Sequence, residues 1–124
     1  MFKELFENRG KQQFKNWRIE DPYGDGFEAI KAGAGYSSIS LYIEDGEYCS
    51  TSTNKHGDPG GKGDCWGKDI TSAILKIQKE HRLTSLSRPE FEYIFDMIKK
   101  SNKTKQPQLL SNNGFESWIE DSKS

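Results

Sequence analysis

Residues 39–53 read Ile-Ser-Leu-Tyr-Ile-Glu-Asp-Gly-Glu-Tyr-Cys-Ser-Thr-Ser-Thr, and this stretch decides the fold. Apolar residues alternate with serine and tyrosine over its first five positions, a period of two that is typical of a strand with one apolar face. Asp45-Gly46 then supplies the positive φ angles that a tight type I′ turn requires. The pattern therefore predicts a β-hairpin in which Ile43 lies opposite Tyr48.

The rest of the hairpin pairing follows from the two-residue turn. Leu41 is expected opposite Ser50, and Ile39 opposite Ser52, because each step away from the turn adds one residue to both strands. Both apolar residues would then face a small hydroxyl side chain. We expect this combination to let a helix approach the sheet closely.

Two helices are predicted after the hairpin. Asp69 is a good N-cap, and an apolar stripe at helical spacing follows it over residues 70–83. Ser87 and Glu90 form a capping box, which predicts the start of a second helix over residues 88–100. The second helix is the better defined of the two at its N-terminus.

Together these elements predict an α+β fold. A small, mostly antiparallel sheet contains the 39–53 hairpin and a strand around Trp17, and the two C-terminal helices pack on one face of the sheet. We expect a single α+β domain over residues 1–100. Residues 101–124 are expected to form a polar linker and a short aromatic C-terminal segment.

Composition limits the class of partner. The chain has 124 residues and a net charge of -1, so it has no broad basic surface and nucleic acid is not an expected partner. No apolar run reaches the length of a membrane span, and the charged N-terminus does not resemble a signal peptide. We therefore expect a cytoplasmic protein without a membrane partner. Cys49 and Cys65 would then be reduced thiols, since a disulfide between them needs an oxidising compartment.

The main candidate site is the stretch Lys-His-Gly-Asp-Pro-Gly-Gly-Lys-Gly-Asp-Cys-Trp-Gly-Lys, residues 55–68. Long connections without regular structure are uncommon in compact domains and are often functional. This one leads into a helix N-terminus, where backbone N–H groups and the helix dipole favour an anion. The expected ligand-binding residues are Lys55, His56, Gly60, Gly61, Lys62, Gly63, Lys68 and Asp69.

No catalytic residue, cofactor or metal is assigned from the sequence. The glycine-rich loop lacks the Lys-Ser/Thr pair of a Walker A loop and the third glycine of a dinucleotide fingerprint. Cys49, His56, Cys65 and His81 have spacings that fit no zinc finger or knuckle. A small enzyme with His56 as general base is the least favoured of three hypotheses.

The sequence favours a small intracellular binding protein that acts by stoichiometric contact, of the inhibitor, immunity or phage host-takeover type. Trp66, Phe115 and Trp118 are the expected partner-binding residues, because exposed aromatic side chains anchor protein interfaces. The alternative for the C-terminal segment is that it folds back onto its own domain. The alternative function is binding of a phosphate-bearing small molecule or nucleotide through the 55–68 loop.

Overall fold

The computed structural model describes Phe14 and residues 16–32, 38–53, 64–81 and 86–123. Their strands form one sheet in chain order, and every neighbouring pair is antiparallel. Helices follow the sheet, which confirms the predicted α+β class. The elements are β1 (Trp17–Glu20), β2 (Glu28–Ala32), β3 (Ser38–Glu44), β4 (Glu47–Thr53), β5 (Asp64–Cys65), α2 (Ile70–His81), α3 (Arg88–Thr104) and α4 (Asn112–Lys123).

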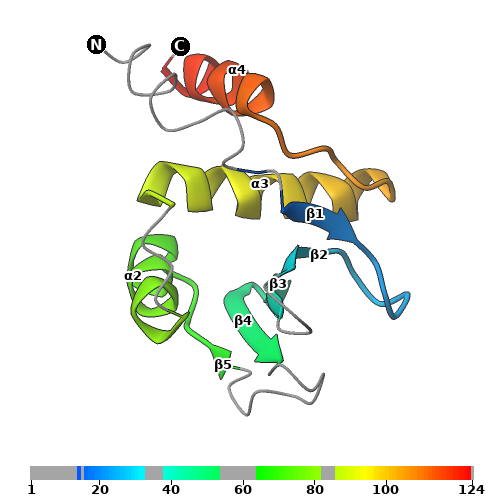
Figure 1. Cartoon of the computed structure of the whole chain (residues 1–124), viewed down its shortest axis with the longest axis vertical. Coiled ribbons are helices and arrows are strands. Elements are labelled where there is room, and N and C mark those ends of the chain that lie inside the picture. Colours follow the sequence, from blue (N-terminus) through cyan, green and yellow to red (C-terminus); the bar gives the residue numbers. More distant parts are fainter. Residues whose placement is uncertain (1–13, 15, 33–37, 54–63, 82–85, 124) are drawn as a thin grey trace.

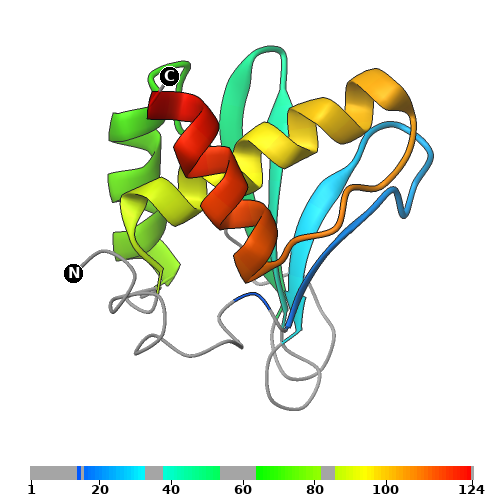
Figure 2. The same ribbon diagram turned by 90° about the horizontal axis from the view of Figure 1, so that it is seen from above.

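The elements are arranged in layers. Helices α2 and α3 pack on one face of the sheet, and α4 lies on the side of α3 that faces away from the sheet (Figure 1). Seen from above, α4 crosses α3 at an angle (Figure 2). Within the described ranges, no helix is both long and apolar enough to cross a membrane.

The predicted hairpin is formed by β3 and β4. Asp45 and Gly46 have φ angles of 53° and 80°, as a type I′ turn requires. Leu41 lies opposite Ser50, and the other predicted pairs are also found. Both Leu41 and Ser50 are fully buried, because this face of the hairpin lies under the helices.

Strands β1 and β2 extend the buried face of the sheet. Trp17 and Ile19 are buried, whereas Arg18 and Glu20 between and beyond them are exposed. Ala29 on β2 lies opposite Ile19 and is fully buried. The alternation follows from strand geometry, which sends successive side chains to opposite faces.

Helix α3 begins as predicted and ends later than predicted. The backbone N–H of Ser87 donates a hydrogen bond to Glu90 Oε1 at 2.6 Å, which closes one arm of the capping box. The helix passes the predicted end at residue 100 and continues to Thr104. Ser101 supports this extension, because its buried hydroxyl donates to the Met97 carbonyl at 2.8 Å and accepts the Gln108 N–H at 3.0 Å.

An aromatic cluster holds α4 against α3. The Tyr93 ring lies 5.4 Å from the Phe115 ring and 5.7 Å from the Trp118 ring, between centroids. Phe14 joins the cluster at 5.4 Å from Tyr93. The Trp118 indole N–H also donates to Asp96 Oδ2 at 2.9 Å. The C-terminal segment therefore folds back onto its own domain.

Gly114 is the point at which α4 approaches Tyr93 most closely. A Cβ at this position would lie 2.5 Å from the Tyr93 hydroxyl oxygen. For Gly114→Ala, the gain in helix propensity is about 1 kcal/mol, whereas overpacking costs about 1–3 kcal/mol. We expect a net loss of about 1 kcal/mol in the free energy of unfolding, measured by urea denaturation. The exposed Ser117→Ala change on the same helix is the control, and equal stability of the two variants would contradict the close contact.

Candidate functional site

Most of the predicted ligand-binding loop lies outside the described residues. This applies to Lys55, His56, Gly60, Gly61, Lys62 and Gly63. Their role as ligand-binding residues stays a prediction. The described end of the loop, residues 64–68, differs from the structureless connection expected there.

Residues 64–67 continue the sheet. Asp64 and Cys65 form β5, which pairs with β4. Beyond β5, the Trp66 N–H donates to the Tyr48 carbonyl at 2.9 Å, and the Tyr48 N–H donates to the Gly67 carbonyl at 3.0 Å. Backbone hydrogen bonds thus hold this segment against β4 as far as Gly67.

Cys49 and Cys65 form a disulfide bond, so the prediction of reduced thiols is wrong. The reason is strand register, since β5 pairs with β4 so that Cys65 lies directly opposite Cys49, with 4.0 Å between their Cα atoms. Disulfides persist in oxidising compartments. This observation weighs against the expected cytoplasmic location, which stays a prediction.

A buried hydrogen-bond network lies on the helix side of β4. The Ser50 hydroxyl accepts the Trp66 indole N–H at 2.9 Å and lies 2.9 Å from His81 Nε2 at the end of α2. The direction of the Ser50–His81 hydrogen bond depends on the histidine tautomer, because the hydroxyl can donate its one hydrogen to Nε2 or accept an Nε2–H with its second lone pair. Trp66, expected at a partner interface, is half-buried and anchors this network instead of standing free.

The Ser50–His81 pair has the atoms of a nucleophile and its base, but its environment excludes that role. Ser50 is fully buried, so its oxygen has no path to a substrate. Burial lowers the pKa of His81, more than the nearby Glu80 carboxylate raises it, so the environment favours a neutral imidazole. We therefore assign the pair to structure, where it joins β4 to the C-terminus of α2.

The N-terminus of α2 is capped by the protein itself. Asp69 Oδ2 accepts the backbone N–H of Ser72 at 3.1 Å, as the predicted N-cap should. Hydrogen bonds from the Ser72 side chain and backbone lower the pKa of this exposed carboxyl. A charged carboxylate thus occupies a position that a bound anion would need, while the neighbouring Lys68 is exposed.

An acidic hollow, which sequence reasoning missed, lies where the β1–β2 turn meets the end of β3. Its volume is about 140 Å³. Three carboxylates and two aromatic rings line it, and no basic side chain from the described part of the chain does so. The lining residues are Asp25, Gly26, Phe27, Glu28, Tyr42, Ile43 and Glu44.

Hydrogen bonds fix the wall of the acidic hollow. The Phe27 N–H donates to Asn102 Oδ1 on α3 at 2.8 Å, and the Gly26 N–H donates to Asp21 Oδ1 at 3.2 Å. Burial raises the pKa of Glu28, and the Asp25 carboxylate raises it further. Negative charge is therefore unfavourably concentrated in this hollow, which is a property that a bound cation would relieve.

A second hollow runs along α3 and is a weaker candidate for a binding site than the acidic hollow. Its volume is about 460 Å³, and its lining residues are Asp96, Lys99, Lys100, Lys103 and Thr104. All of these lining residues belong to α3, so no second element of the described ranges lines the space. Lys99 Nζ already donates to the Tyr48 hydroxyl at 2.7 Å, and Asp96 already accepts the Trp118 indole N–H.

The disulfide should contribute measurably to stability. It links residues separated by 16 positions, and closing a loop of that length stabilises a fold by about 3 kcal/mol in the chain-entropy account. We expect a reductant to lower the free energy of unfolding by about 2–4 kcal/mol in urea denaturation. The Cys49→Ala/Cys65→Ala double variant should not respond to the reductant. An unchanged unfolding curve of the native protein would contradict this role.

The lowered pKa of His81 makes stability depend on pH. The folded state prefers the neutral imidazole, so the full contribution is present above the unfolded pKa of about 6.5 and is lost as the pH falls through the lower, folded value. Urea denaturation at about pH 7.5 and about pH 5 should therefore show a greater loss for the native protein than for His81→Gln. An equal loss in both proteins would show that other groups cause the dependence.

Comparison with known proteins adds no functional information. No known protein family, curated protein sequence or solved structure matches this chain. Its function has to be argued from the geometry of its own residues.

Proposed function

We propose that this chain is a binding protein that acts by stoichiometric contact, and that its acidic hollow receives a lysine or arginine side chain of a partner protein. An inhibitor or immunity protein acts in this way. The supporting observation is the hollow itself, in which Asp25, Glu28 and Glu44 stand beside the rings of Phe27 and Tyr42.

The lining of the acidic hollow suits a side-chain cation better than an anion or a neutral group. Carboxylates accept charge-assisted hydrogen bonds from guanidinium and ammonium groups, and arginine can engage a carboxylate through two parallel bonds. The aromatic ring of Tyr42, which lies on the same face of the sheet as Glu28, can serve as a cation–π partner. The same side chains would repel a phosphate group.

The state of Glu28 supports the same assignment. Its pKa is raised by burial and by the Asp25 and Asp21 carboxylates, against a hydrogen bond from Ser40 that lowers it. A cation in the hollow would reverse the like-charge repulsion and favour the ionised carboxylate. Part of the binding free energy would then come from relief of the repulsion between Glu28 and its neighbouring carboxylates in the free protein.

The acidic hollow lies on the side of the sheet away from the described helices (Figure 1). Glu28 and Tyr42 alternate with the buried Ala29 and Leu41, so they belong to the face of the sheet opposite α2 and α3. None of the described helices packs on that face (Figure 1). A protein partner could therefore cover the sheet while one of its basic side chains enters the hollow.

A short peptide with a central arginine, blocked at both ends and flanked by alanines, is the probe for this proposal. Binding should shift the amide NMR signals of Phe27, Glu28 and Tyr42, and the shifts should saturate at one peptide per protein. The same peptide with citrulline, which is uncharged and nearly isosteric, should not bind. Asp25→Asn and Glu28→Gln should each weaken binding about tenfold, equivalent to the loss of one charge-assisted hydrogen bond.

Glu120→Gln is the matched control, because Glu120 is an exposed carboxylate on α4. This variant should bind the arginine peptide as the native protein does. Equal binding of the citrulline peptide, or unchanged affinity of both Asp25→Asn and Glu28→Gln, would refute the proposal.

A further inference from the structure

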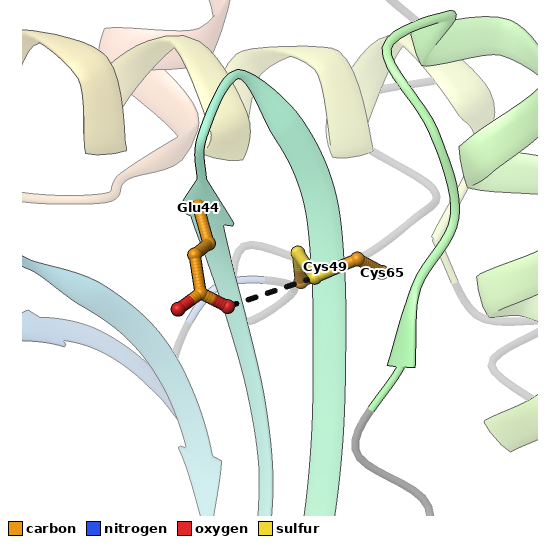
Figure 3. Close-up of side chains that lie close together, drawn as sticks. All are labelled: Glu44, Cys49 and Cys65. Carbon is orange, nitrogen blue, oxygen red and sulfur yellow. Dashed lines mark hydrogen bonds between the residues drawn. A yellow bond between two sulfur atoms is a disulfide. The ribbon is translucent and has the colours of Figure 1, made fainter.

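Three potential metal ligands meet beside the disulfide. Glu44, Cys49 and Cys65 come from the neighbouring strands β3, β4 and β5, and the Glu44 carboxylate points towards the two sulfurs (Figure 3). One oxygen and the two sulfur atoms all lie within 4.8 Å of one another. The distance between Glu44 Oε2 and Cys65 Sγ is 3.8 Å.

While the disulfide is intact, we do not expect this arrangement to bind a metal ion. A disulfide sulfur carries no hydrogen, so the 3.8 Å approach, dashed in Figure 3, is a contact between Glu44 and Cys65 without a hydrogen bond. The lone pairs of a disulfide are also poor ligands compared with those of thiolates. The metal-binding capacity of the cluster therefore depends on reduction.

We propose that reduction of the Cys49–Cys65 disulfide creates a binding site for a thiophilic divalent cation such as Zn²⁺, held by the two thiolates and the Glu44 carboxylate. Three protein ligands leave the fourth tetrahedral position for water. The strand pairing of β3, β4 and β5 keeps the three side chains together on one face of the sheet after the covalent link is gone.

The chemistry balances with a thiol or phosphine reductant. A thiol reductant gives up two electrons and two protons, its own sulfurs become a disulfide, and the protein S–S bond becomes two thiols. A phosphine gives up two electrons and becomes a phosphine oxide, while one water supplies its oxygen and the two protons of the thiols. Attack is expected at Cys65, which is exposed, whereas Cys49 is fully buried. Metal binding then releases one proton from each thiol as the two sulfur–metal bonds form.

Electrostatics explain why the reduced cluster needs a cation. Two thiolates and a carboxylate at these distances would repel one another. A divalent cation compensates the three negative charges. Thiolate ligands select zinc-like metals over Mg²⁺ and Ca²⁺, which prefer oxygen ligands.

Cobalt is the probe that tests this site, because Co²⁺ can replace Zn²⁺ and its thiolate bonds give visible charge-transfer absorption. The full chain is reduced with a phosphine under anaerobic conditions and titrated with Co²⁺. We expect the thiolate band to saturate at one Co²⁺ per chain and to disappear when Zn²⁺ is added. The oxidised protein should show no such band.

Variants separate the three-ligand site from simple binding by two cysteines. Cys65→Ser should lose most of the thiolate band, and Glu44→Gln should weaken binding at least about tenfold, since even a ligand's outer-shell partner is worth that much. Glu47→Gln is the matched control, because Glu47 lies opposite Glu44 across the same turn and is not in the cluster.

Far-UV circular dichroism of each sample shows whether the chain is folded when its cobalt spectrum is recorded. Absence of the band in the reduced native protein, whether folded or unfolded, would overturn the proposal. Equal affinity of Glu44→Gln and the native protein would also overturn it. This site does not depend on the proposed function, whose test changes Asp25 and Glu28 and leaves the cysteines oxidised.

Discussion

Two successive residues of β4, Cys49 and Ser50, tie strand β5 and the C-terminal end of α2 to the sheet. Adjacent residues of a strand point to opposite faces, so Ser50 lies beneath the helices while Cys49 faces the other side. On one face the Ser50 hydroxyl binds the Trp66 indole and the His81 ring, and on the other face Cys49 is bonded to Cys65. Strand β5 has only 2 residues, and these two anchors reinforce the backbone hydrogen bonds that Tyr48 makes with Trp66 and Gly67.

The energetics of the two anchors differ in kind. The disulfide acts largely by limiting the unfolded chain, in the chain-entropy account. The Ser50 network acts in the folded state, where a buried hydroxyl with both of its partners is favourable and the same hydroxyl with one partner missing is costly. Protonation of His81 places a charge in a partly buried position, which burial disfavours, and leaves the disulfide intact. The covalent anchor therefore keeps β5 near β4 under conditions that weaken the polar one.

The parts of the fold that sequence could predict are those set by local periodicity. The period of two and Asp45-Gly46 fixed the hairpin register, and the Ser87–Glu90 box fixed the start of α3. Strand β5 is too short to show a period, so the pairing of Cys49 with Cys65 could not be read from spacing. The acidic hollow was missed because its residues come from two segments, 25–28 and 42–44, that only the β2–β3 pairing brings together. The predicted glycine-rich site lies largely outside the described residues, so its ligand-binding role stays a prediction.

Glu44 connects the two proposed sites. Glu44 lines the acidic hollow, and its carboxylate also lies 3.8 Å from the Cys65 sulfur. A carboxylate oxygen that ligates a cation is no longer equally available to a guanidinium group, so metal bound at the reduced cysteines and a basic side chain in the hollow would compete for the same negative charge. Thermodynamic linkage makes this competition reciprocal. If bound metal lowers the affinity for the partner by some factor, the bound partner lowers the affinity for the metal by the same factor. The disulfide prevents metal binding, because its sulfurs are not thiolates. In the oxidised protein all three carboxylates of the hollow therefore remain available to a basic side chain of the partner.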